Sequence, residues 1–116
     1  LAPTGRTVVV PESQQDIATA LSGSAPAYFF LVVEALVDAG VAGGLPRRVA
    51  SDLAVQAALG AGTMLRETGE EAVILRSQVT SPGGSTAAAL RELEAGGVRE
   101  AFARAVEACA RRSAGS

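Results

Sequence analysis

The chain has 116 residues, which is enough for one domain with a hydrophobic core and too few for two. Apolar residues make up 48% of it, but the rings are limited to three Phe and one Tyr, so the core must consist of Ala, Val and Leu, as in closely packed helices. A formal charge of −2 gives no electrostatic basis for binding nucleic acid or an anionic membrane, and we expect neither partner.

The counts of metal-binding and nucleophilic residues exclude several kinds of site. There is no His, so a His general base and a Ser-His-Asp triad are excluded. One Cys forms neither an internal disulfide nor a zinc cluster, so no metal site is expected. We interpret Cys109, in "AVEACARR", as a small buried thiol on a helix, and we expect a cytoplasmic protein.

The beginning of the chain predicts a single strand. "RTVVVPES", residues 6–13, is a β-branched run that ends at Pro11. One strand cannot form a sheet, so it either pairs with a partner chain or is the last strand of an upstream domain. Because the chain starts at Leu1 without a signal-peptide pattern, we expect it to be cut from something longer.

Everything after Pro11 predicts helix, and the first helix covers residues 14–22. The "SGSAP" stretch, residues 22–26, is expected to interrupt it, because Pro26 starts or kinks a helix. The longest apolar run, residues 25–33, is too short to cross a bilayer.

Two long helices follow, and both present surfaces that need covering. Residues 27–39 are apolar almost all round the helix, so they must be buried on nearly every side. The next helix opens at Pro46, closes at Gly69, and has a face of Ala and Gly over residues 50–62 that lets another helix approach closely. One small chain cannot cover both surfaces, so we expect a homodimer.

Three shorter helices complete the chain, over residues 70–79, 86–95 and 98–112. The last two are separated by a Gly-Gly pair at Gly96. The sequence therefore predicts an all-α fold, a helical bundle, with one short strand in front of it.

The turn "TSPGGST", residues 80–86, carries the pattern of a site. Gly83 and Gly84 can both take positive φ, so that successive N–H groups converge at the positive end of the following helix, a site for a carboxylate or a phosphate. In the alternative interpretation Ser85 caps the helix, the glycines only make the turn, and nothing binds. Because no Lys follows and no strand precedes, the turn is neither a P-loop nor a dinucleotide fingerprint.

Three segments carry a resemblance to a known family. They are "VPESQQDIATALSGSAPAYFFLVVEALVDAGVAGGLPRRVA", "LAVQAALGAGTML" and above all "LRSQVTSPGGSTAAALRELEAGGVREAFARAVEA". Together they resemble the C-terminal domain of pyrroline-5-carboxylate reductase, over residues 8 to about 113. The family usually has Gly where this chain has Ala25, and often Thr where it has Ser85.

The resemblance implies a fold, a domain organisation and a reaction. The fold is the dimerisation type, similar to the C-terminal domain of 6-phosphogluconate dehydrogenase. Residues 1–10 would be the remnant of an upstream Rossmann domain that binds NADPH or NADH, and residues 11–116 the all-helical dimerisation and substrate-binding domain. The enzyme reduces the small molecule 1-pyrroline-5-carboxylate to L-proline as a homodimer, with room for a higher oligomer of dimers.

The resemblance also assigns the turn, which it sets at the dimer interface. The chemistry of imine reduction fits this role, because the backbone N–H groups of Ser81, Gly83, Gly84 and Ser85 can hold the substrate carboxylate. Thr86 Oγ1 is our candidate for the contact to the ring nitrogen, the one catalytic side-chain contact. The chain alone would then be inactive, because it has no cofactor-binding residues of its own. The alternative is a stand-alone helical dimerisation module without a ligand. The predicted substrate-binding residues are Ser81, Pro82, Gly83, Gly84, Ser85 and Thr86.

Overall fold

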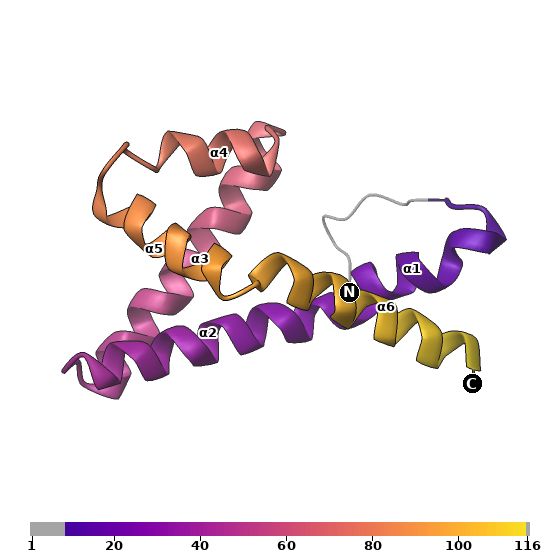
Figure 1. The fold of residues 1–116 in the computed structure, drawn as a ribbon, viewed down its shortest axis with the longest axis horizontal. Helices are drawn as coiled ribbons and strands as arrows, with labels where there is room; N and C mark the ends of the chain where they lie inside the picture. The colour runs from indigo at the N-terminus through magenta and orange to yellow at the C-terminus, as the bar shows by residue number, and fades with distance from the viewer. Residues whose placement is uncertain (1–8, 116) are drawn as a thin grey trace. The chain divides into compact units, whose positions relative to one another are not determined.

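The computed structural model describes residues 9–115, and within them it contains helices joined by short turns and no strand (Figure 1). A 3₁₀ turn, Glu12–Gln14, leads into the first helix, and a π turn, Ala20–Ser24, joins the first helix to the second. The all-α prediction is confirmed. The helices are α1 (Gln15–Thr19), α2 (Ala25–Ala42), α3 (Arg47–Thr68), α4 (Ala72–Gln78), α5 (Ser85–Ala95) and α6 (Val98–Gly115).

The predicted strand, residues 6–13, lies partly outside the described residues, since residues 6–8 precede them. Its described part does not form a strand, since Val9 and Val10 have no regular structure and the 3₁₀ turn follows Pro11. The chain divides into two compact units, one made of the chain up to Pro26 together with the chain from Arg99, and the other running from Ala27 to Val98.

In the first unit, "SGSAP" does not interrupt the helix, which corrects the sequence prediction. Instead one wide π turn keeps the backbone helical, and the Ala25 N–H donates to the Ala20 carbonyl five residues back. The Ser24 hydroxyl donates to the same carbonyl at 2.8 Å. Pro26 has no N–H and its ring clashes with the preceding turn of a regular α-helix, so the wider turn accommodates it. Ala25 has φ −58° and ψ −31°, so the methyl group at this position fits an ordinary helical backbone.

Most of α6 belongs to the first unit. Ala20, in the π turn, and Ala110, in α6, are its buried apolar residues among those described. The Cys109 thiol donates to the Ser24 hydroxyl at 3.3 Å, and Cys109 is half-buried rather than buried as predicted. A free thiol of this kind packs as a small apolar group with a weak donor.

Because the π turn leaves the helix continuous, Glu12–Ala42 forms one helical stretch of 31 residues. By length and composition alone this stretch is long and apolar enough to cross a membrane, whereas the prediction from residues 25–33 concerned that shorter run alone. Only 6% of its most apolar window is buried within the chain. The core helix of a protein whose partner covers it has the same composition, so this property by itself does not identify what surrounds the helix.

In the second unit, the C-terminal half of α2 packs on the N-terminal half of α3. Val37, Ala50 and Ala54 form the buried cluster, with Val33 and Val41 packed against it. The helices approach closely because α2 has a glycine at the contact: a Cβ on Gly40 would lie 3.1 Å from the Ala50 Cβ. Small residues thus bring two backbones together here, as ridge-and-groove packing requires.

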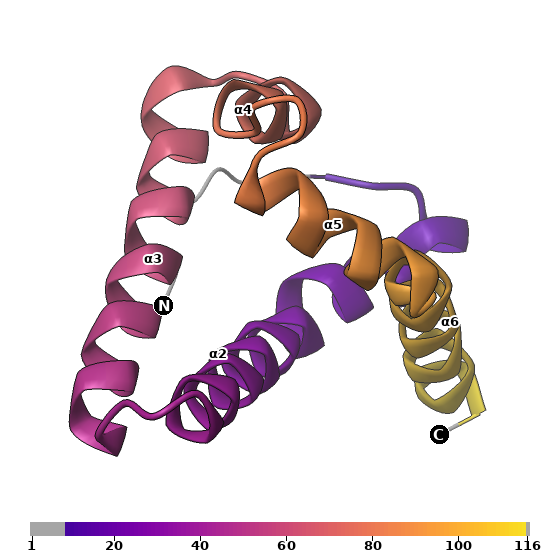
Figure 2. The same ribbon diagram turned by 60° about the vertical axis from the view of Figure 1, so that its left-hand side comes forward.

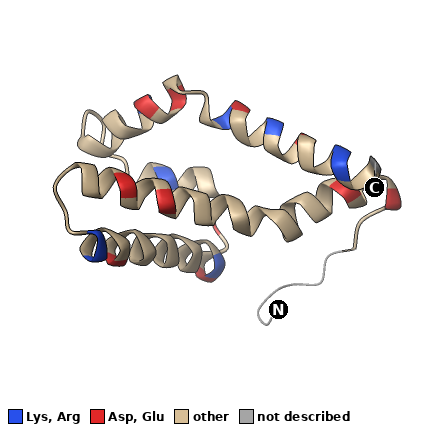
Figure 3. Cartoon of the chain, turned by 90° about the horizontal axis from the view of Figure 1, so that it is seen from below, with Lys and Arg blue, Asp and Glu red and all other residues tan. Residues whose placement is uncertain are grey.

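Beyond this contact, most of the apolar surface of α2 and α3 stays uncovered by the chain itself. Phe29 and Phe30 are each 69% exposed, and so is Leu59 of α3. These three line a groove of about 430 Å³ with Val33, Val55 and Ala58. Figure 3 shows charged residues spread along the helices, and α3 has none over residues 53–65. An exposed apolar surface of this extent is typical of an association face.

Candidate functional site

The segment that contains the predicted site starts where α3 ends. Gly69 ends α3 with φ 65°, and its N–H donates to the Leu65 carbonyl at 3.3 Å. Helix α4 begins beside the C-terminal end of α3 (Figure 2). Helix α4 is only 7 residues long, and the predicted turn, residues 80–86, begins just after its end.

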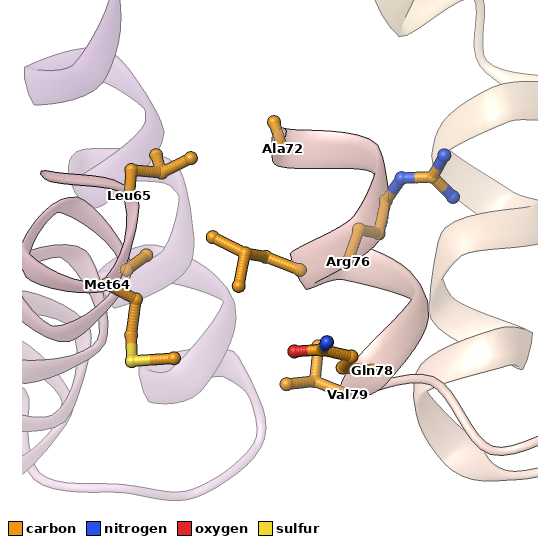
Figure 4. Close-up of a pocket in the computed structure, with 8 residues that line it drawn as sticks. Met64, Leu65, Ala72, Arg76, Gln78 and Val79 are labelled. Carbon is orange, nitrogen blue, oxygen red and sulfur yellow. The ribbon is translucent and has the colours of Figure 1, made fainter. Parts of the chain in front are cut away.

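Between α3 and α4 lies a pocket of about 320 Å³ with an almost wholly apolar lining. Met64 and Leu65 lie on the α3 side, and Figure 4 shows the Arg76 side chain of α4 pointing away from them. Such a pocket offers apolar contact but little that would orient a polar substrate. The residues that line it are Ala61, Met64, Leu65, Ala72, Leu75, Arg76, Gln78 and Val79.

The turn itself is built from Ser81 to Gly84. The Gly84 N–H donates to the Ser81 carbonyl at 3.0 Å, and Gly83 has φ 72°. Pro in the second place and a positive-φ Gly in the third are the requirements of a type II turn. The sequence prediction is confirmed for Gly83, since this backbone conformation favours glycine.

The prediction of positive φ is wrong for Gly84, which has φ −83° and ψ −178°. Glycine fits at this position for a different reason, namely space. A Cβ on Gly84 would lie 3.2 Å from the Ser81 carbonyl oxygen and 3.4 Å from the Ser81 Cβ. The first glycine therefore supplies the bend, and the second lets the chain pass close to its own backbone.

Helix α5 starts immediately after the turn. Gly84 occupies the N-cap position, and no side chain caps the helix, so Ser85 is the first helical residue and not the cap that the alternative interpretation required. The first hydrogen bond of the helix runs from the Ala88 N–H to the Gly84 carbonyl at 3.1 Å. The N–H groups of Ser85, Thr86 and Ala87 therefore have no intrahelical acceptor. No acidic residue lies in the first turn of α5, so an anion there would meet no like charge from that turn.

The predicted donors are close together but not equally available. The Gly84 N–H is already used inside the turn, whereas the N–H groups of Ser81, Gly83 and Ser85 have no acceptor among residues 9–115. Five of the six predicted residues are exposed and Gly84 is half-buried. The structure thus brings Ser81, Pro82, Gly83, Gly84, Ser85 and Thr86 into one exposed segment at the start of α5.

The two hydroxyls at the start of α5 face different directions. Ser85 and Thr86 are the first two residues of the helix. Successive helical residues point about 100° apart, as 3.6 residues per turn requires. A small ligand bound on one side of the helix end is therefore close to one of the two hydroxyls and not to the other.

Sequence reasoning did not identify Thr80, the residue before the turn. Its hydroxyl donates to the Arg76 carbonyl at 2.6 Å and its N–H donates to the Ser77 carbonyl at 3.1 Å. The available signal was a Thr just beyond the end of a helix, where a hydroxyl can bond the carbonyl four residues back.

Comparison with known proteins supports the resemblance found in the sequence. Residues 12–116 match the family described as pyrroline-5-carboxylate reductase dimerisation. The chain is 56% identical to the pyrroline-5-carboxylate reductase of Corynebacterium melassecola over 97% of the chain and 42% of that protein. It is 54% identical to that of Mycobacterium tuberculosis over 94% of the chain and 43% of that protein.

Solved structures agree. The pyrroline-5-carboxylate reductase of Coxiella burnetii superposes with a TM-score of 0.85 at 46% identity, over 90% of this chain and 38% of that one. The Plasmodium falciparum enzyme, solved with NADP bound, gives 0.84 at 38% identity, over 90% and 41%. The chain spans about two fifths of the length of these relatives. From its helices, its Pro-Gly-Gly turn and these matches, the chain belongs to the pyrroline-5-carboxylate reductase family, whose dimerisation region it matches from residue 12 to its last residue.

Proposed function

We propose that the chain is the dimerisation and substrate-binding part of an NADPH- or NADH-dependent reductase that converts 1-pyrroline-5-carboxylate into L-proline. The observation that supports this best is the turn from Ser81 to Gly84 at the N-terminal end of α5, where the N–H groups of Ser81, Gly83 and Ser85 have no acceptor among the described residues. Family membership supplies the substrate class, since the relatives that match over most of this chain are named for that reduction.

The turn would hold the substrate by its carboxylate. The N–H groups of Ser81, Gly83 and Ser85 have no acceptor among the described residues, and the positive end of the α5 dipole lies at the same place. Hydrogen bonds from backbone N–H groups to a charged oxygen are about twice as strong as neutral ones. Because the donors are backbone groups, their geometry is fixed by the turn and not by flexible side chains.

Thr86 would be the side chain that contacts the reacting part of the ring. A cyclic imine accepts a hydride at its carbon most readily when its nitrogen is protonated, and the reduced nicotinamide supplies that hydride. Thr86 Oγ1 would accept a hydrogen bond from this nitrogen and so orient the ring and favour its charged form. In this scheme the chain needs no His, in keeping with its composition.

The cofactor belongs to another part of the enzyme. Residues 9–115 contain no strand followed by a glycine-rich turn and helix, so they offer no pyrophosphate site of the dinucleotide-binding kind. We place NADPH or NADH mainly on an upstream domain, of which residues 1–10 would be the remnant. A cytoplasmic location suits the single free thiol.

The partner would be a second copy of the chain. The exposed apolar side chains of α2 and α3 around Phe30 and Leu59 are the surfaces that this copy would cover. The family description names dimerisation, and pairs of dimers could assemble further. The second candidate function, a dimerisation module without a ligand, uses the same surfaces and leaves the turn at residues 81–86 empty.

A direct test compares the chain with the enzyme that joins it to an upstream nucleotide-binding domain. We expect the joined enzyme to oxidise NADPH or NADH only when pyrroline-5-carboxylate is present. The chain alone should give no oxidation under the same conditions, because it lacks a pyrophosphate site. Absorbance of the reduced nicotinamide measures both. Steady oxidation by the chain alone would overturn this division of labour, and a joined enzyme that ignores pyrroline-5-carboxylate would overturn the proposed function.

A further inference from the structure

Thr80 is the last residue before the Ser81–Gly84 turn, and it is tied twice to the end of α4. Its hydroxyl donates to the Arg76 carbonyl at 2.6 Å, and its N–H donates to the Ser77 carbonyl at 3.1 Å. Thr80 also lines a cavity of about 550 Å³ between α4 and α5, together with Ala87 and Leu90 of α5. It is half-buried, although its neighbours Val79 and Ser81 are exposed.

Both bonds of Thr80 join the residue before the turn to α4. Among residues 79–86, Thr80 alone makes a side-chain hydrogen bond. The Gly84 N–H donates to the Ser81 carbonyl within the turn, and the Gly84 carbonyl accepts from the Ala88 N–H of α5, so neither of these bonds reaches α4. The direction in which the N–H groups of Ser81 and Gly83 point therefore depends on how Thr80 is fixed to α4.

We propose that Thr80 is a positioning residue for the substrate site, which acts through its hydroxyl bond to Arg76 and touches no substrate itself. This inference rests on the proposed function of the turn. Without the bond, the turn samples orientations in which its N–H groups do not converge. The apparent affinity for the carboxylate then falls in proportion to the fraction of molecules in which the turn keeps its binding-competent orientation. Once the substrate is bound, Thr86 and the ring have the same geometry as before, so turnover is preserved.

The chain contains a matched control for this bond. The Thr68 hydroxyl donates to the Met64 carbonyl at 2.7 Å, also four residues back and also at the end of a helix. Thr68 differs in two respects. Its hydroxyl also accepts a hydrogen bond from the Glu70 N–H at 3.1 Å, and the residues after it are not part of the proposed substrate site. Replacing either Thr by Val removes the hydroxyl and keeps the shape of the side chain. A general loss of stability would affect both variants, whereas a positioning effect belongs to Thr80 alone.

The experiment measures kcat and KM for pyrroline-5-carboxylate in the intact reductase, for the unchanged protein and for Thr80→Val, Thr80→Ser and Thr68→Val. One hydrogen bond of this kind corresponds to about a three- to tenfold change in an equilibrium. We expect Thr80→Val to raise KM by about that factor with kcat nearly unchanged. Thr80→Ser should return KM to within about twofold, because it keeps the hydroxyl. Thr68→Val should leave KM unchanged, whatever its effect on the melting temperature.

Each other outcome counts against the inference in a recognisable way. An unchanged KM in Thr80→Val, an equal rise in Thr68→Val, or no recovery in Thr80→Ser would overturn the role of Thr80 and leave the proposed function standing. If the unchanged enzyme does not reduce pyrroline-5-carboxylate, the proposed function and this inference fall together. Should Thr80→Val fold poorly in the intact enzyme, Thr80→Ala and hydrogen exchange at the amides of residues 81–86 give the same comparison. Unchanged exchange there would again overturn it.

Discussion

Phe30→Asp in α2 is expected to prevent the chain from associating and to leave it largely unfolded. Phe30 is 69% exposed within one chain and lies in the apolar groove between α2 and α3. If a second copy covers this groove, the substitution places an unpaired carboxylate in an apolar interface, which costs several kcal/mol. In a symmetric dimer the change occurs twice. Among residues 9–115 the buried apolar residues of one copy are four alanines and Val37, so we expect the core of the monomer to be too small to stay folded without the partner.

Light scattering and circular dichroism at micromolar concentration measure this result. Phe30→Leu is the matched control, since it keeps an apolar side chain at the same position and should remain a folded dimer. A folded, monodisperse monomer of the unchanged chain would contradict the account of α2 as an interface helix. So would a Phe30→Asp variant that associates as well as the unchanged chain.

The second large effect concerns Thr86 in the intact reductase. Losing a hydrogen bond to a charged group costs about 1.5–3 kcal/mol. Thr86→Ala should therefore lower kcat/KM by about one to two orders of magnitude, at roughly 1.4 kcal/mol per decade. Thr86→Ser should retain most of the activity, because it keeps the hydroxyl. Association should survive both changes, since Thr86 lies outside the apolar surfaces of α2 and α3.

Ser85→Ala is the control for Thr86, because the two hydroxyls are adjacent and both exposed. Ser85 makes no cap to α5, and its proposed contribution comes from the backbone N–H, which the substitution keeps. We expect nearly unchanged kinetics. Steady-state measurements on both variants separate the possibilities. If Ser85→Ala abolishes activity and Thr86→Ala does not, the roles of the two hydroxyls are reversed; if both are silent, the turn has no catalytic side chain.

Most of the helices could be predicted from proline and glycine. Pro46 and Gly69 were expected to bound the second of the two long helices, and α3 runs between them with Gly69 in the left-handed conformation. The Gly-Gly pair was expected to end the helix before residue 98, and α5 ends at Ala95. These residues act locally, through missing N–H groups or permitted φ values, so their effect can be recognised without knowledge of the packing.

The features that sequence reasoning missed depend on longer-range geometry. "SGSAP" was expected to interrupt the helix, with Pro26 starting or kinking the next one, but a π turn accommodates the Pro26 ring and keeps α2 continuous with α1. Gly84 was expected to bend the chain, but it provides space against the Ser81 carbonyl. Neither the wider helical turn before Pro26 nor the close approach of Gly84 to Ser81 follows from residue types alone, because each depends on where the neighbouring backbone lies.

The residues of the turn could be chosen as a candidate anion site from the sequence, but the hydrogen bonds of their N–H groups could not be predicted. The order Pro, Gly, Gly and two hydroxyls in front of a helix indicated an anion site before any geometry was known. It could not reveal that the Gly84 N–H is used by Ser81. It also could not reveal that the Thr80 hydroxyl donates to the Arg76 carbonyl of α4.

The most direct test of the central claim, that the turn binds the carboxylate of a proline-like ring, is a titration of the chain with L-proline followed at the backbone amides. We predict that the amide signals of Ser81, Gly83, Ser85 and Thr86 shift in a saturable way at millimolar proline. Pyrrolidine, which has the ring without the carboxylate, should leave them unchanged. Amides of residues 81–86 that do not respond to proline, or that respond equally to pyrrolidine, would contradict the claim and leave a dimerisation module whose turn is only a connection.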